Sequence, residues 1–325
     1  MKTLISLGDI DEAIYLAKKQ GFYLIKNRLF RTSQQRVKSA WNSATSKRRT
    51  AWWEIPAVRK RWNKIITGNS ETDYLKYLHN NYFIEGATIL SPGCGTGEKE
   101  IKIASMPKVK RLDAFDIAEK RIAIANEKAK SKNLDNIIFI VADIENFTPQ
   151  ENFYDVILFD SFLHHVHNID KILMRFLTSL KDDGILVINE YVGQNRFQWT
   201  TEQLQKANEL LLKIPKHLRK REFDGKIKTK IFRPGILRMI LSDPSEAVNS
   251  EAILPEIHKH TEIIEEKPYG GNLLQLILKD ISHNFINETD ENRQVLKFLF
   301  GEEDKFIAEY QSDFLFGIYR KKLPD

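Results

Sequence analysis

Short apolar runs and amphipathic stretches alternate through the middle of the chain. Residues 88–90 have the β-branched, apolar character of a buried strand, and residues 98–104 then follow a helix-compatible pattern. A second apolar run ends at Asp116, a third ends near Asp143, and the alternation continues to Glu190. Repeated strand-helix-strand units predict a mainly parallel sheet with helices on both faces, so we expect an α/β fold.

Three glycines separate the first predicted strand from its helix. Gly93, Gly95 and Gly97 allow a tight turn and let a ligand approach the backbone without meeting a Cβ atom. Asp116 follows about 20 residues later, at the end of the second predicted strand, where a carboxylate can accept both hydroxyls of a ribose. Ligands of parallel sheets bind at the carboxyl ends of the strands, so these ends predict one cleft.

The glycine spacing and the segments behind it resemble the class I S-adenosylmethionine-dependent methyltransferases, which carry the GxGxG form of this loop. Residues 137–144, 153–165 and 180–190 match later strands of that family in the expected order. The resemblance implies a doubly wound, seven-stranded, Rossmann-like sheet, mostly parallel, with the last strand antiparallel beside the fifth. Ser91 is a departure, because the family usually has Asp or Glu there for contact with the methionine amino group.

The same resemblance implies which residues bind the cofactor, S-adenosylmethionine. Asp116 would take the ribose hydroxyls, and Asp143 with the amide of Ile144 would read the adenine edge. An alternative role for Asp143 is to cap the turn that follows its strand. The implied cofactor-binding residues are Ser91, Gly93, Cys94, Gly95, Gly97, Asp116, Ile117, Asp143, Ile144 and Asp160.

Methyl transfer from a sulfonium requires that the acceptor be aligned with the methyl group and, where necessary, lose a proton. His164 and His165 follow the fourth predicted strand, and either could accept a hydroxyl proton. Glu190 and Tyr191 end the fifth strand and are alternative bases. We expect no metal site, although His167 completes a His-His-x-His run, because few further ligands are near in sequence.

Aromatic residues and arginines supply the predicted acceptor contacts. Trp53 and Arg59 lie in the N-terminal region, and Arg196 and Trp199 follow the fifth predicted strand. Such residues can stack a sugar or a base and hold an anion. The alternative is that they pack, with the tryptophan docking the N-terminal helices and the second pair forming the base of an insertion.

The pattern divides the chain into four parts. Residues 1–82 form a helical N-terminal region, and residues 83–191 form the Rossmann-like core that binds S-adenosylmethionine. Residues 192–259 form a helical insertion that would cap the open end of the cleft and cover the substrate. Residues 260–325 complete the core sheet and include two inserted helices, expected at 273–286 and 291–310.

Two nucleic-acid chemistries are disfavoured. The fourth predicted strand is followed by Asp160-Ser-Phe-Leu and not by the Asn/Asp-Pro-Pro-aromatic loop of enzymes that methylate base amines, and the sole cysteine, Cys94, lies in the glycine loop. Further segments resemble a bacterial subgroup often associated with sugar, glycan or secondary-metabolite pathways. We therefore expect O-methylation of a small polar, sugar or glycan acceptor. These segments are residues 52–59, 190–193, 243–248 and 269–272.

Composition leaves two other functions open. The 325-residue chain has a formal charge of +6, and between Lys26 and Lys64 the only acid is Glu54. A basic region of this kind suits an RNA methyltransferase, and a non-catalytic S-adenosylmethionine-binding module is a third hypothesis. A single cysteine excludes a disulfide framework. No apolar run suits a signal peptide or a membrane span, so we expect a cytoplasmic protein, of an oligomeric state that the sequence leaves open.

Overall fold

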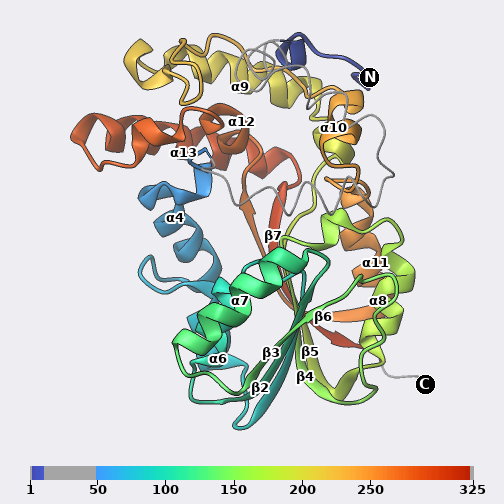
Figure 1. The fold of residues 1–325 in the computed structure, drawn as a ribbon. Coiled ribbons are helices and arrows are strands. Elements are labelled where there is room, and N and C mark those ends of the chain that lie inside the picture. The colour runs from blue at the N-terminus through green and yellow to red at the C-terminus, as the bar shows by residue number, and fades with distance from the viewer. Residues whose placement is uncertain (1, 11–48, 323–325) are drawn as a thin grey trace.

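The computed structural model of the protein describes residues 2–10 and 49–322 (Figure 1). Much of the basic region that begins at Lys26 lies outside these described residues, at positions 26–48. The expected role of that region in RNA binding therefore stays a prediction. In the part of the chain that is described, no helix is both long and apolar enough to cross a membrane.

A seven-stranded sheet forms the centre of the fold, in the order β3-β2-β1-β4-β5-β7-β6. Strand β7 pairs antiparallel with β5 and with β6, and every other neighbouring pair is parallel. The predicted Rossmann-like sheet, with its last strand antiparallel beside the fifth, is confirmed. The strands are β1 (Ala87–Pro92), β2 (Val109–Asp116), β3 (Ile137–Val141), β4 (Tyr154–Asp160), β5 (Leu180–Tyr191), β6 (Thr261–Gly270) and β7 (Phe314–Lys321).

Helices cover both faces of the sheet because the strands of a parallel sheet are apolar on both sides. Buried residues of α5 (Tyr74–Asn81), α6 (Glu98–Ala104) and α7 (Glu119–Ser131) form one core cluster with the sheet. Those of α8 (Ile169–Leu177) and α11 (Ile253–His260) form a second cluster on the opposite face. The sheet is thus the middle of three layers.

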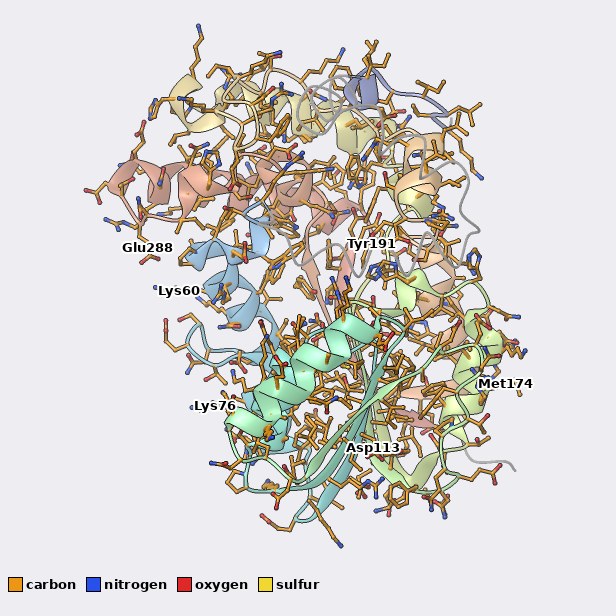
Figure 2. All side chains as sticks on the ribbon, viewed as in Figure 1. Lys60, Lys76, Asp113, Met174, Tyr191 and Glu288 are labelled. Atoms are coloured by element: carbon orange, nitrogen blue, oxygen red, sulfur yellow. The ribbon has the colours of Figure 1, made fainter. Side chains whose placement is uncertain are left out.

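A third cluster lies beyond the carboxyl ends of the strands, where the insertion meets the C-terminal helices (Figure 1). It joins α9 (Thr201–Lys213) to α12 (Leu274–Leu278), α13 (Asp290–Glu309) and the N-terminal helix α4 (Pro56–Thr67). The remaining helix of the insertion is α10 (Ile236–Ser242). Tyr191, the last residue of β5, lies where the sheet meets these helices, whereas Asp113 lies lower in the sheet (Figure 2).

One predicted helix in the C-terminal part is wrong. The helix expected at 273–286 is interrupted, because α12 ends at Leu278 and only a short 3₁₀ turn, Ser282–Phe285, follows. Asp280 between them has a φ of 69°, a left-handed conformation through which no α-helix continues. The helix expected at 291–310 is confirmed as α13.

Candidate active site

The loop between β1 and α6 has the left-handed backbone that its glycines permit. The angle φ is 73° at Gly93 and 71° at Gly97. A Cβ atom would lie 2.1 Å from the Phe162 ring at Gly93 and 2.5 Å from the Phe139 ring at Gly97. Both conformation and space therefore require glycine here. Burial raises the pKa of the Cys94 thiol between them, so this cysteine stays protonated.

Asp116 ends β2 beside this loop. Its Oδ2 accepts a hydrogen bond from the amide of Gly95 at 3.0 Å, and its Oδ1 accepts one from the amide of Ala118 at 2.7 Å. Burial raises the pKa of Asp116, although both amides favour the charged form. Each carboxylate oxygen keeps a lone pair for a further donor. A carboxylate fixed in this way beside half-buried Ile117 fits the two hydroxyls of a ribose.

Asp143 lies next to Asp116 at the same edge of the sheet, since the amide of Ala142 donates to the carbonyl of Asp116 at 3.1 Å. The Oδ1 atom of Asp143 accepts the amide of Glu145 at 3.1 Å, which is a turn-capping contact. Ile144 is buried in the core cluster on one face of the sheet. The turn-capping role is therefore present, and contact of Asp143 and Ile144 with adenine stays a prediction.

Asp160 joins three elements at the end of β4. The Tyr74 hydroxyl from α5 donates to Oδ2, and Asn189 from β5 donates to Oδ1 at 3.1 Å. The ammonium of Lys99, on α6, lies 2.5 Å from Oδ2. Both carboxylate oxygens of Asp160 therefore already have partners.

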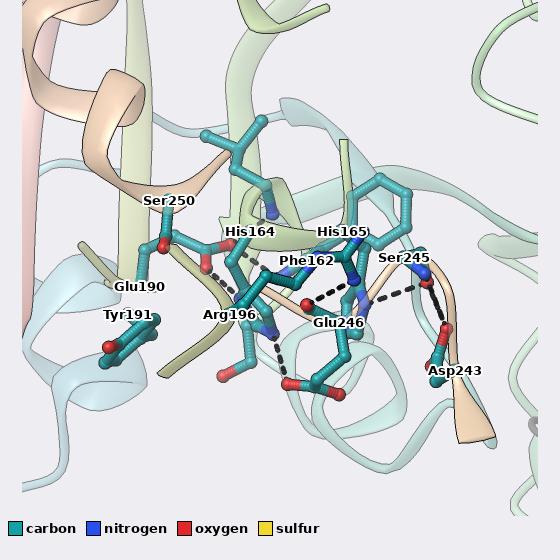
Figure 3. Close-up of polar contacts among 12 residues, drawn as sticks. Phe162, His164, His165, Glu190, Tyr191, Arg196, Asp243, Ser245, Glu246 and Ser250 are labelled. Carbon is teal, nitrogen blue, oxygen red and sulfur yellow. Dashed lines mark hydrogen bonds and ion pairs between the residues drawn. The ribbon is translucent and has the colours of Figure 1, made fainter. Parts of the chain in front are cut away.

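His164 and Glu190 form a buried pair just after β4 and near the end of β5 (Figure 3). His164 Nδ1 lies 2.8 Å from Glu190 Oε2, while Glu190 Oε1 accepts the amides of Phe162 at 2.5 Å and Leu163 at 2.6 Å. Burial opposes a charged imidazole, but the charge and hydrogen bond of Glu190, together with the charges of Glu246 and Asp243, outweigh it and raise the pKa of His164. Glu190 thus both fixes the histidine loop and stabilises an imidazolium.

His165 has the opposite electrostatic environment. Burial and the neighbouring His164 lower its pKa well below the usual range, so its imidazole is neutral. Its Nδ1 lies 3.2 Å from Ser245 Oγ, and Ser245 in turn donates to Asp243 Oδ1 at 2.6 Å. Because the serine proton is directed at Asp243, the histidine must donate from Nδ1, which leaves its Nε2 as the acceptor.

A loop of the insertion, residues 243–248, closes over the two histidines (Figure 3). The amide of Val248 donates to the carbonyl of His164 at 3.0 Å, and Glu246 Oε1 lies 3.8 Å from His164 Nε2. Arg196 holds this loop, since its guanidinium donates to the carbonyls of Glu246 at 2.9 Å and Pro244 at 2.6 Å. Arg196 is therefore engaged with the backbone of the loop.

A cleft of about 430 Å³ opens on the other side of Glu246. This volume is within the range of small-molecule sites. Its walls include Trp53, Phe197, buried Trp199 and Asp243, together with Glu246. The cleft is thus aromatic in part, and its lining contains both acidic side chains, among them Asp243 and Glu246, and basic ones, among them Arg238 and Lys279.

Of the predicted catalytic and acceptor-binding residues, Trp53 and Trp199 line this cleft, whereas Arg59, Arg196, His164, His165, Glu190 and Tyr191 do not. Arg59 is exposed on α4. Tyr191 is buried, and its hydroxyl donates to the carbonyl of Gln194 at 3.0 Å. Burial raises the pKa of Tyr191 well above the usual range, so the phenol stays protonated.

Two groups of described residues bring histidine and carboxylate ligand atoms together. One ring nitrogen each of His164 and His165 and a carboxylate oxygen of Glu246 lie within 4.8 Å of one another. The other group consists of Asp170, Glu256 and His260 and lies outside the cleft. Its Asp170 forms ion pairs with Lys259 and with His260. Only the first group borders the candidate site.

Several residues of the site were missed by sequence reasoning. Tyr74 contacts an acid 86 positions away, and Ser245 contacts a histidine 80 positions away, so no local pattern predicts either. Lys99 follows the glycine loop directly but has no distinctive spacing. Glu246 lies in segment 243–248, which resembles the bacterial subgroup. No other feature of the sequence indicated that Glu246 belongs to the site.

Comparison with known proteins agrees with this geometry. A family model described as "Methyltransferase domain" matches residues 84–267, more than half of the chain. The chain belongs to this family, and with its sheet and glycine loop it is a class I S-adenosylmethionine-dependent methyltransferase.

Curated relatives cover part of the chain. It is 32% identical over 121 residues to a malonyl-[acyl-carrier protein] O-methyltransferase of Bacillus cereus, a match that covers 37% of this chain and 43% of the relative. It is 25% identical over 128 residues to an (S)-coclaurine N-methyltransferase of Thalictrum flavum subsp. glaucum, covering 39% of this chain and 35% of that one. The matched region therefore spans less than half of either relative.

Among solved structures, the fold is similar to that of a geranyl diphosphate C-methyltransferase from Streptomyces coelicolor, determined with Mg²⁺, geranyl diphosphate and S-adenosyl-L-homocysteine. The TM-score is 0.50 at 10% sequence identity, over 90% of this chain and 99% of that one. At this identity the similarity concerns the fold alone.

Proposed function

We propose that this methyltransferase transfers a methyl group from S-adenosylmethionine to a hydroxyl oxygen of a small polar acceptor, such as a sugar or a glycan unit. The observation that carries the proposal is the buried His164–Glu190 pair, which borders an aromatic and charged cleft through Glu246. An oxygen acceptor has to lose its proton, and a histidine held by a carboxylate is suited to take it.

The cofactor end of the site is supported by the glycine loop and Asp116. Bound S-adenosylmethionine supplies an activated methyl group on sulfur. Gly93 and Gly97 give the loop its left-handed turns, and Asp116 offers two fixed acceptor oxygens to the ribose. Residues Asp143 and Ile144, at the next strand end, would contact the adenine.

His164 is the proposed base. Its Nδ1 proton is held by Glu190, so the lone pair of the neutral ring is on Nε2, which faces Glu246 and the cleft. After proton transfer, Glu190 stabilises the imidazolium, as its effect on the pKa of His164 indicates. His165 is the second candidate, but its lowered pKa makes it the weaker base.

The acceptor would lie between the sheet and the cap. Trp53 is 43% exposed and, with Phe197, offers ring faces on which the apolar side of a sugar can stack. Asp243 and Glu246 can accept hydrogen bonds from its hydroxyls. Arg196 would act indirectly by holding the loop that carries Glu246.

An amine acceptor is the second candidate, because acidic and aromatic side chains in one cleft also suit a cation. A neutral amine needs no base before it attacks the methyl group, so the two acceptors respond differently to loss of His164. An RNA acceptor remains a prediction, to be tested by salt-dependent binding.

The test is a screen for transfer of labelled methyl to sugars, other hydroxyl compounds and amines, followed by His164→Asn on the accepted substrate. Asparagine keeps a donor towards Glu190 but has nothing at the position of Nε2. For an oxygen acceptor, kcat should fall by about 10²–10⁴ with cofactor affinity retained. His167→Asn, at an exposed neighbouring position, is the control. Full activity of His164→Asn would contradict the role of His164 and favour an amine acceptor.

A further inference from the structure

A carboxylate from helix α6 lies against the end of β1. Glu100 Oε1 accepts a hydrogen bond from Ser91 Oγ at 2.8 Å, and the two residues are 3% and 1% exposed. Ser91 is the residue whose position, two before the first glycine, is usually acidic in the family. The carboxyl group that is missing from the strand is therefore present beside the same position, supplied from the helix.

Among the described residues, Glu100 has fewer hydrogen-bond and ion-pair partners than the other acids around the loop. Asp160 is bound by Lys99, Tyr74 and Asn189. Asp116 is bound by two backbone amides. Glu100 has its hydrogen bond from Ser91, a neutral hydroxyl.

The charges facing Glu100 come from its own helix, the neighbouring strand end and the loop. Burial raises the pKa of Glu100 to about 7; Lys99 lowers it, and Asp160 raises it. Glu100 in turn raises the pKa of the Cys94 thiol, where Asp116 and Arg121 also act, and that of the Tyr74 phenol. A buried carboxyl in such surroundings is costly to ionise unless a cation arrives.

We propose that Glu100, oriented by Ser91, is the carboxylate that receives the ammonium group of the cofactor's methionine part. The inference rests on the proposed function, because it assumes that the cofactor binds along the glycine loop. It assigns the recognition of this positive charge to a residue of α6, nine positions after the strand residue that usually carries the acid.

Calorimetric titration with two adenosine compounds tests the assignment. S-adenosylhomocysteine has the ammonium group, whereas methylthioadenosine has the nucleoside and sulfur but lacks the amino-acid end. Glu100→Gln should weaken binding of S-adenosylhomocysteine by at least about tenfold, since a charge-assisted hydrogen bond is lost, and leave methylthioadenosine unchanged. Glu98→Gln is the matched control, because Glu98 lies on the same helix but is 77% exposed.

Proton release gives a second readout. With a pKa of about 7, Glu100 is partly protonated near neutral pH, and an arriving ammonium group lowers this pKa. Binding of S-adenosylhomocysteine near pH 7 should therefore release more protons from the wild type than from Glu100→Gln. Titrations in buffers of different ionisation enthalpy measure this difference, which should vanish with methylthioadenosine.

A double variant that places the carboxylate on the strand tests whether the lost cofactor affinity can be restored. The double variant S91D/E100S exchanges the two groups that now form the hydrogen bond. It should recover most of the affinity for S-adenosylhomocysteine that Glu100→Gln loses.

The outcomes separate the alternatives. Equal losses for both compounds in Glu100→Gln would make Glu100 a purely structural residue, and no loss for either would place the ammonium elsewhere; both overturn the proposal. If the wild type binds neither compound, the cofactor site itself is wrong, and the assignment of Glu100 fails with it.

Discussion

At the scale of single residues, the site consists of acids with different partners and therefore different roles. Asp116 is fixed by backbone amides, Asp160 by side chains from three elements, and Glu190 by two amides and a histidine. Each partner set limits what else the carboxylate can bind. Sequence reasoning named these three acids because each ends a strand.

Asp116→Ala should weaken S-adenosylmethionine binding by roughly 10–100-fold, because hydrogen bonds to a buried ribose are lost. Isothermal titration measures the effect. Asp116→Asn is the comparison, since its amide can still accept from one loop amide and contact one hydroxyl. Near-unchanged affinity of the alanine variant would refute the ribose role.

The charge of Glu190 sets the pH dependence expected of His164. The base is active when neutral, so kcat/KM should rise with pH through the pKa of His164, which its acidic neighbours raise above the ordinary value of a histidine. Glu190→Gln removes the charge that raises this pKa, so the rising limb should move to lower pH. Glu262→Gln, at an exposed position on β6, should leave the limb in place. An unmoved limb in Glu190→Gln would mean that another group titrates.

At the scale of elements, the helices beyond the sheet depend on polar contacts between distant segments. Lys228, from the insertion, is buried and donates to the carbonyls of Leu276, Ile277 and Lys279 at the end of α12. These carbonyls have no hydrogen-bond donor within α12, because the helix ends here and no further helical turn supplies one. A lysine of the insertion thus terminates a helix of the C-terminal part.

Lys228→Met should lower the free energy of unfolding by about 2–3 kcal/mol, because buried carbonyls lose their donor while the apolar stem is kept. Urea unfolding followed by circular dichroism measures the change. Lys226→Met, on the same segment but exposed, should have little effect. Equal stability of the two variants would show that the contact with α12 contributes nothing.

At the scale of the whole molecule, the candidate base lies on the boundary between core and cap. The histidines follow β4 in the core, whereas Ser245 and Glu246 come from the insertion. The amide of Arg196 donates to the carbonyl of Ala247 at 2.6 Å, which ties the start of the insertion to the same loop. The candidate base therefore has partners from both the core and the insertion.

A further test asks whether His164, His165 and Glu246, which meet at this boundary, bind a metal ion. We expect a chelator to leave activity unchanged, and added Zn²⁺ to inhibit by binding His164, His165 and Glu246 together. Activity assays before and after dialysis against chelator, and with micromolar Zn²⁺, measure both effects. Loss of activity on chelation that a divalent ion restores would contradict the expectation and make this cluster a resident metal site.

Local pattern by itself determined the sheet and the cofactor loop of this protein. Alternating apolar runs, three glycines and acids at strand ends are signals within one strand-loop-helix unit, so the parallel strands and the position of Asp116 at a strand end could be predicted, whereas the antiparallel last strand followed from the family resemblance. The break of α12 at Asp280 could not, because a left-handed residue depends on its surroundings.

Only the tertiary structure decided what these residues contact. Ser91 alone suggested a lost carboxyl group, yet the fold supplies one through Glu100. His164 and His165 are adjacent in sequence, but packing gives one a carboxylate and the other a serine, so their pKa values move in opposite directions. The reason is physical: burial and charge act through space, between groups that the chain separates by up to 86 positions.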